Sequence, residues 1–455
     1  MIVNADDKKL LKSIINYRLK ERSDNGAIVQ LIIRPECNQK CDYCYLVQHG
    51  EESYPRYLRA DSKTIIKNTE ILMNYFIEEK IKIQKLDIFA GDLFYDNIFF
   101  EIVKPIYHYF KECNNLTKDS VIAMPCNMSF CEDKQKIKKV QQVIDDFKKI
   151  NVRFFFSYSS DGIYSTDVRE HKQISEEFFN TVLKFCEKNS GGVHPMIGYE
   201  NIDNAIKNYE WWKKKYKEFD LGNTIPYYLE VRNNGWSKEK LLKYEEFLNY
   251  VLEDEAKYFN YDIDVISRKM LGCFDYDKVT NKYISFNSRN PFIEIRISDE
   301  NDTNIHCGIG FFDICVNCAD LRLTPCHRLA YPALSGGNFI VKDNKIVDLE
   351  PSENINGFIH LTDYNTTDKP RCVSCPINRV CIKGCVGAQY EYFRDPFFPI
   401  PNICTLLEIK YRTLFKFYDK IGVFDYIQEH YPGYQYLNIL IEINNFFKNG
   451  GILNG

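Results

Sequence analysis

The stretch Cys37-Asn38-Gln39-Lys40-Cys41-Asp42-Tyr43-Cys44-Tyr45 decides how the rest of the chain is interpreted. It places three cysteines in the spacing C-x3-C-x2-C directly after the apolar run 28–33, which predicts a β-strand. Three thiolates at the carboxyl end of a strand indicate a [4Fe–4S] cluster, and they are one ligand short of four. The remaining iron could bind a small chelating cofactor. A zinc knuckle and three buried free cysteines are the alternatives that the spacing leaves open.

Length and composition limit the kind of protein. A chain of 455 residues with 45% hydrophobic residues predicts two domains with well-filled cores. The balance of 59 basic and 63 acidic residues argues against a general nucleic-acid or membrane-surface binder. There is no apolar run of about 18 residues and no signal-peptide core at the start of the chain, so we expect no membrane association and a cytoplasmic location.

The distribution of the cysteines indicates metal sites. In a reducing compartment, 17 cysteines favour metal ligation over disulfides. Three lie in 37–44 and nine lie between Cys307 and Cys404. The scattered remainder are expected to be small buried hydrophobic residues; they are Cys113, Cys126, Cys131, Cys186 and Cys273.

From residue 28 to about 290, short apolar segments alternate with longer amphipathic ones, which predicts a parallel β/α sheet or barrel. The predicted strands are 28–33, 85–89, 121–124, 152–158, 192–197 and 227–231. The predicted helices lie near 62–79, 98–113, 134–149, 175–188, 202–218 and 238–258. An amphipathic helix over 6–22 precedes them and is expected to cap the barrel. Ligand sites in such folds lie at the strand ends.

The cysteine motif in this context resembles that of the radical SAM superfamily. There the open iron binds the amino and carboxylate groups of S-adenosylmethionine. The resemblance includes Tyr43, the aromatic residue that the family places near the adenine, and Tyr45, as in its peptide- and protein-modifying branches. It implies an α/β fold built on a partial (β/α)6 TIM-like barrel.

Two strand ends carry residues that match the cofactor-binding segments of this family. Gly91 and Asp92 stand where the family has a Gly-Gly-Glu-Pro-like segment that binds the methionine ammonium, although the rest of that segment does not match. Ser159 and Asp161 fit the Ser-x-Asp-Gly segment, in which the serine supports the ribose hydroxyls. Arg169 could face the carboxylate.

Asn127, after the third predicted strand, could belong to the same shell. Without the cysteine motif, all of these positions would be interpreted as turn residues and surface charge.

A second cysteine pattern, Cys372-x2-Cys375-x5-Cys381-x3-Cys385 followed by Cys404, is the hallmark of the SPASM domain, which holds two auxiliary [4Fe–4S] clusters. By this resemblance the outer cluster would be held by Cys372, Cys375, Cys381 and Cys404, and the inner one by Cys307, Cys326 and Cys385.

The fourth ligand of the inner cluster is left open by the sequence. Cys315 and Cys318 form an additional C-x2-C pair, and either could complete that cluster, or its iron could stay open for substrate. A zinc site built from Cys315, Cys318, Cys372 and Cys375 is the alternative.

The predicted parts of the chain follow from these two patterns. They are an N-terminal capping helix (1–27), the radical SAM partial barrel (28–294), the SPASM domain (295–410) and a C-terminal helical tail (411–455).

His327 bears on the kind of reaction. Family members that oxidise a sulfatase cysteine or serine to formylglycine carry an aspartate base directly after the second SPASM cysteine. In this chain that position is His327, which could take a proton near neutral pH or could be a structural residue beside a cluster.

The resemblance implies an enzyme that cleaves S-adenosylmethionine reductively to a 5′-deoxyadenosyl radical, which removes hydrogen from a peptide or protein substrate, for example to form a thioether crosslink. A reductant such as flavodoxin or ferredoxin is the expected partner. Only 36 residues precede the first cluster cysteine, too few for a winged-helix module, so leader recognition would need a separate protein. The alternatives are a radical SAM dehydrogenase of a small molecule, an electron carrier and a zinc-organised binding module.

Overall fold

The chain forms two compact units. The computed structural model describes residues 5–21, 23–113, 120–165, 175–222, 224–232, 235–270, 275–277, 282–284, 290–295, 297, 313–362, 370–381 and 384–452. The first unit comprises Met1–Ser160, Thr166–Val193 and Gly308–Tyr364. The second comprises Asp161–Ser165, His194–Cys307 and Asn365–Gly455.

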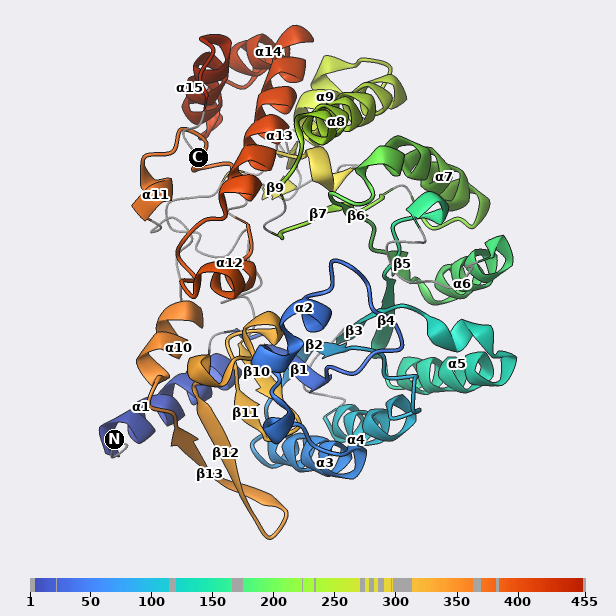
Figure 1. Ribbon diagram of the computed structural model, residues 1–455, viewed down its shortest axis with the longest axis vertical. Helices are drawn as coiled ribbons and strands as arrows, with labels where there is room; N and C mark the ends of the chain where they lie inside the picture. Colours follow the sequence, from blue (N-terminus) through green and yellow to red (C-terminus); the bar gives the residue numbers. More distant parts are fainter. Residues whose placement is uncertain are drawn as a thin grey trace. The chain divides into compact units, whose positions relative to one another are not determined.

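A nine-stranded sheet organises the first unit, with the strand order β13-β12-β11-β10-β1-β2-β3-β4-β5 (Figure 1). Five consecutive strands of this sheet are parallel. They are β1 (Ala27–Arg34), β2 (Ile83–Ala90), β3 (Val121–Cys126), β4 (Arg153–Tyr158) and β5 (Gly192–Val193). Because parallel neighbours end at the same edge, the segments after β1, β2, β3 and β4 meet there.

Helices connect the parallel strands, and all of them except α2 were predicted from the sequence. They are α2 (Tyr45–Ser53), α3 (Ser62–Glu78), α4 (Phe99–Glu112), α5 (Lys134–Lys149) and α6 (Glu176–Asn189). Three of them begin at a capping side chain that accepts a backbone hydrogen bond: Asp61 for α3, Asp133 for α5 and Ser175 for α6. The caps explain why these helix starts agree with the predicted ones within a residue or two.

Four further strands extend this sheet beyond β1, which the sequence did not predict. β10 (Ile314–Asn317) runs parallel to β1. It is followed by the antiparallel strands β11 (Arg322–Leu323), β12 (Gly337–Lys342) and β13 (Lys345–Pro351). The same unit holds α10 (Ile355–Thr362) and α1 (Ala5–Asn16), which continues into a π-helix, Tyr17–Glu21. An ion pair of 2.5 Å between Lys12 and Asp348 ties α1 to β13.

The second unit contains two small sheets. β6 (Met196–Ile197) and β7 (Tyr228–Leu229) form a parallel pair, and β8 (Asp275–Asp277) and β9 (Lys282–Ile284) form an antiparallel pair. The predicted strand 192–197 is therefore split into β5 and β6, which belong to different sheets.

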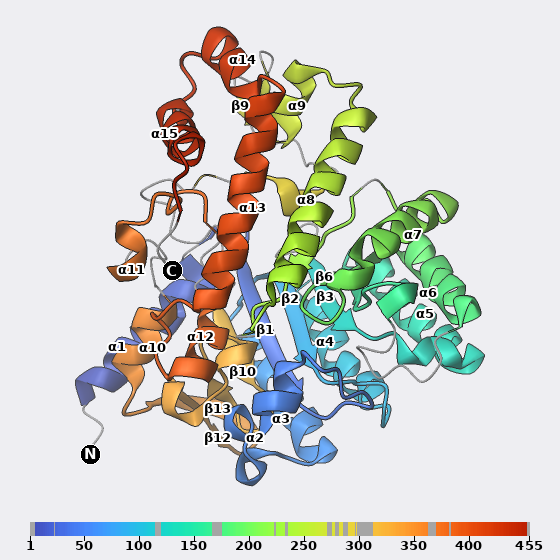
Figure 2. The ribbon, with the colours of Figure 1, turned by 45° about the horizontal axis from the view of Figure 1, so that its top comes forward.

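Helices make up most of the second unit. They are α7 (Ala205–Glu218), α8 (Lys238–Tyr258), α9 (Ile263–Met270), α11 (Pro370–Val373), α12 (Val386–Phe393), α13 (Pro401–Lys420), α14 (Val423–His430) and α15 (Leu437–Lys448). The long helices α8 and α13 lie side by side, and Arg412 of α13 pairs with Glu245 of α8 (Figure 2). The α/β class, the β/α order and the C-terminal helices are thus confirmed. None of the helices in the described ranges is both long and apolar enough to cross a membrane.

Candidate functional site

The three cysteines of the first motif follow β1 at its carboxyl end. The Cys37 side chain is exposed, and those of Cys41 and Cys44 are half-buried. The Cys44 N–H donates to the Cys41 carbonyl at 3.0 Å, and Cys44 occupies the N-cap position of α2. Tyr43 lies in the turn between these two cysteines. The loop thus places three thiols after the same strand.

Gly91 fixes the start of this loop from the neighbouring strand end. The Gly91 N–H donates to the Arg34 carbonyl at 2.9 Å, and the Asp92 N–H donates to the Glu36 carbonyl at 2.8 Å. A Cβ on Gly91 would lie 2.0 Å from the Glu36 carbonyl oxygen, so no other residue permits this approach. The segment after β2 therefore holds the two residues that lead into Cys37.

The Asp92 carboxylate is buried beside the loop, with 2% of the residue exposed. It accepts hydrogen bonds from the Phe94 N–H at 2.9 Å and from the Ser129 hydroxyl at 2.8 Å. The Cys37 side chain is exposed, but the surrounding protein removes much of the water around its thiol. This desolvation, and then the Asp92 charge, raise the pKa of Cys37 to about 12. The carboxylate thus organises its own loop close to Cys37, and its contact to a methionine ammonium stays a prediction.

Asn127 reaches the cysteine loop from the end of β3. Its Nδ2 donates to Asn38 Oδ1 at 2.8 Å, and its Oδ1 accepts from the Ser129 N–H at 3.0 Å. Because Asn38 follows Cys37 directly, the predicted residues Gly91, Asp92 and Asn127 are all brought to the cysteine loop.

The remaining predicted cofactor residues lie in different places. Ser159 follows β4, and its N–H donates to the Cys126 carbonyl at 2.8 Å. Asp161 belongs to the second unit, where its Oδ1 accepts from the Met196 N–H at 3.0 Å and its carbonyl accepts from the Trp212 indole at 3.2 Å. Asp161 therefore ties its turn to β6. Arg169 lies outside the described residues, and so do Cys273 and Cys307.

Gln30 is a residue of this region that the sequence interpretation missed. It is fully buried on β1, and its Oε1 accepts from the His327 N–H at 2.8 Å and from the Cys315 thiol at 3.1 Å. Its Nε2 lies 3.3 Å from His327 Nδ1. The signal that could have revealed it is a glutamine in the middle of the apolar run Ile28–Ile33.

The His327 ring is held on several sides. It stacks on Phe89, at the end of β2, with ring centroids 3.7 Å apart and planes 9° apart. The centroid of the Tyr45 ring lies 5.8 Å from that of the His327 ring, in an edge contact. The Tyr54 hydroxyl donates to the His327 carbonyl. Desolvation, and then the charge of Arg328, lower the pKa of His327 to about 3, so the imidazole is neutral at physiological pH.

Cys315 and Cys318 face opposite sides of the sheet. Cys315 pairs in register with Gln30 and shares its face, whereas the Cys318 thiol is hydrogen-bonded to Thr69 of α3. Burial raises the pKa of Tyr54, and the neighbouring Cys315 and Cys326 thiols contribute to this shift. The His327 N–H donates to Gln30, so Cys326, the residue before His327, lies near the face of the sheet that Cys315 occupies.

The five cysteines of the second pattern surround one cavity in the second unit. Its volume is about 620 Å³. The cysteines that line it are Cys372, Cys375, Cys381, Cys385 and Cys404. Thiolates are ligands of zinc and of iron–sulfur clusters alike, so the chemistry of this lining fits either group.

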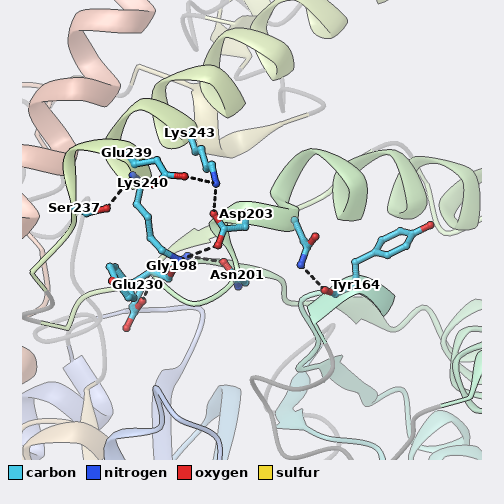
Figure 3. A network of polar contacts seen from close by, with 11 residues as sticks. Tyr164, Gly198, Asn201, Asp203, Glu230, Ser237, Glu239, Lys240 and Lys243 are labelled. Atoms are coloured by element: carbon cyan, nitrogen blue, oxygen red, sulfur yellow. Dashed lines mark hydrogen bonds and ion pairs between the residues drawn. The ribbon is translucent and has the colours of Figure 1, made fainter.

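A buried ion network, which we did not predict from the sequence, lies at the ends of β6 and β7. Arg232 pairs with Glu230 and with Glu200. Glu230 also accepts from the Tyr199 N–H at 3.0 Å, and Lys240 donates to the Tyr199 carbonyl at 2.6 Å. Figure 3 shows Lys240 and Glu230 beside the turn at Gly198. The network connects the turn after β6 to the segment after β7.

We expect Arg232→Ala to lower the free energy of unfolding by about 3–5 kcal/mol, because it leaves the Glu230 carboxylate buried without its countercharge. Urea unfolding measures this loss. Lys243→Ala, which removes exposed ion pairs with Asp203 and Glu239, is the matched control and should leave the free energy of unfolding nearly unchanged. Equal losses in the two variants would contradict the assignment of Arg232 as the centre of the network.

No protein-family model matches the chain, and no curated protein matches it in sequence. Solved structures do match. Native anSMEcpe with bound AdoMet and Cp18Cys peptide is 15% identical, with a TM-score of 0.51 over 92% of this chain and 99% of that chain. A hexahistidine-tagged form of anSMEcpe with bound AdoMet is 13% identical, with a TM-score of 0.50 over 91% and 98%. anSME is an anaerobic sulfatase-maturating enzyme of the radical SAM SPASM class.

The chain shares the fold of anSMEcpe over most of its length. The resemblance inferred from the two cysteine patterns is thereby confirmed at the level of the fold. The scattered cysteines Cys113, Cys126, Cys131 and Cys186 are buried, as predicted.

Proposed function

We propose that this chain is a radical SAM enzyme. Cys37, Cys41 and Cys44 would hold a [4Fe–4S] cluster, which supplies the electron that cleaves S-adenosylmethionine to methionine and a hydrogen-abstracting 5′-deoxyadenosyl radical. The observation that carries the proposal is the cysteine loop itself, anchored at the strand edge by the backbone of Gly91 and Asp92. We place the enzyme in the cytoplasm, since free thiols persist in a reducing compartment.

Each part of the loop's surroundings has a task in this proposal. Gly91 and Asp92 keep the start of the loop in place, and Asn127 fixes Asn38 beside Cys37. Tyr43, Ser159, Asp161 and Arg169 remain proposed contacts to the cofactor.

The auxiliary clusters are proposed at two places. Cys372, Cys375, Cys381 and Cys404 would hold the outer one, since all four line the same cavity. For the inner cluster we propose Cys307, Cys326 and Cys385, with Cys315 rather than Cys318 as the further ligand. Cys315 is the member of the pair that lies on the side of Cys326.

The proposed substrate is a peptide or protein. Support comes from the anSMEcpe structure, which contains a bound Cp18Cys peptide and shares the fold over most of the chain. Flavodoxin or ferredoxin is the proposed reductant, and a separate protein would bind a leader peptide. A small-molecule substrate is the second candidate, because no contact of the described residues identifies the chemical group that is oxidised.

Substrate class can be tested by the rate of 5′-deoxyadenosine formation. We expect cysteine-containing peptides such as Cp18Cys to raise this rate above the substrate-free rate and to be changed in mass, because a bound substrate consumes the radical productively. Polyols serve as small-molecule probes. Stimulation by a polyol and by no peptide would favour the dehydrogenase, and a protein that retains zinc in place of iron would favour a binding module.

A further inference from the structure

We propose that Gln30 fixes His327 as the neutral tautomer that carries its hydrogen on Nε2, so that His327 donates a hydrogen bond to the substrate and does not act as the base. The substrate contact rests on the proposed function. The tautomer is a property of the chain itself and can be measured without turnover.

The orientation of the Gln30 amide follows from its partners. Its oxygen end faces the His327 backbone N–H at 2.8 Å, and a backbone N–H can only donate. The Cys315 thiol donates to the same oxygen at 3.1 Å. The backbone donor alone fixes this orientation, so it holds whether or not Cys315 binds a metal.

The orientation of the amide decides the tautomer of the imidazole. With the oxygen turned to the backbone N–H, the NH₂ end of Gln30 faces His327 Nδ1 at 3.3 Å. An amide NH₂ only donates, so Nδ1 must accept and the ring hydrogen must be on Nε2. Within the described part of the chain, His327 Nε2 has no hydrogen-bond partner.

The position of the ring suits a substrate contact. The ring stacks on Phe89, two residues before Gly91, and Gly91 holds the cysteine loop. Edge contact with Tyr45 and the hydrogen bond from Tyr54 to the His327 carbonyl restrict its rotation and displacement. His327 is therefore a fixed ring near the strand edge, where ligands bind in α/β folds.

The same contacts oppose a role as base. A general base must turn a lone pair toward the substrate. In this tautomer the lone pair lies on Nδ1, which faces the NH₂ of Gln30, whereas Nε2 carries the hydrogen.

The tautomer can be read from the two ring nitrogens of ¹⁵N-labelled histidine in the full chain. The His327 signal is assigned among eight histidines by its loss in His327→Gln. We expect the Nε2–H form in the wild type and the Nδ1–H form in Gln30→Glu, since a carboxylate only accepts. Gln30→Met controls for the loss of the amide and should give a mixture. An Nδ1–H form in the wild type, or no change in Gln30→Glu, would overturn the assignment.

Two variants of the cluster-loaded enzyme distinguish a hydrogen-bond donor from a base at His327. Glutamine can donate a hydrogen bond but cannot serve as a base, whereas leucine can do neither. We expect His327→Gln to retain substrate turnover within about tenfold of the wild type and His327→Leu to lose roughly a further tenfold or more. Equal loss of turnover in the two variants would overturn the donor role. A wild-type enzyme that cannot cleave S-adenosylmethionine without substrate would instead refute the proposed function.

Discussion

Replacing Cys37, Cys41 and Cys44 together with alanine is expected to reduce 5′-deoxyadenosine formation to the level of a protein-free control. The three thiols are the only protein ligands proposed for the first cluster, and the loop that carries them is set by backbone contacts that the substitutions do not touch. The iron content should fall by about four atoms per chain, while the auxiliary clusters remain. Iron analysis and product quantification check both expectations.

The matched control for this variant removes three buried cysteines elsewhere. Cys113, Cys131 and Cys186 are buried and belong to neither cysteine pattern. Their replacement by alanine should leave the iron content unchanged and cost only packing energy. Continued cleavage by the Cys37, Cys41 and Cys44 variant would exclude this loop as the site of the chemistry.

Gly91→Val is expected to have the second large effect. Its Cβ would meet the Glu36 carbonyl oxygen at 2.0 Å and the Pro35 carbonyl oxygen at 2.6 Å, and both are backbone atoms that cannot move aside alone. The loop must shift, so we expect loss of the first cluster together with about 1–3 kcal/mol of stability. Iron content and urea unfolding measure the two effects.

Gly50→Ala provides the comparison for Gly91→Val. Gly50 lies in α2, close to the same loop in sequence, and a Cβ there would meet nothing within 4 Å. The change should keep the cluster and stabilise the helix by about 0.5–1 kcal/mol. If Gly91→Val also kept its iron, the anchoring role given to the Gly91 backbone would be wrong.

The strands and helices of the β/α part could be predicted because each carries local signals. Apolar runs mark β1 to β4, and capping residues such as Asp61, Asp133 and Ser175 mark helix starts. The short strand β10 could not be predicted in this way. Its pairing with β1 joins residues about 285 positions apart, as in the contact between Gln30 and Cys315.

The candidate site was predictable only in part for the same reason. Cysteine spacing and the Gly91-Asp92 pair are local patterns, and the structure brings them together. The C-x2-C spacing of Cys315 and Cys318 does not reveal that strand alternation turns the two thiols to opposite faces. The pairing of Arg232 with Glu200 likewise depends on two turns that meet only in the folded chain.

The central claim is that the Cys37–Cys44 loop supports reductive cleavage of S-adenosylmethionine. The direct measurement is quantification of 5′-deoxyadenosine and methionine after the anaerobically reconstituted chain is mixed with S-adenosylmethionine and dithionite. We predict that both products form in equal amounts. A protein that binds its full complement of iron and sulfide yet forms neither product would contradict the claim.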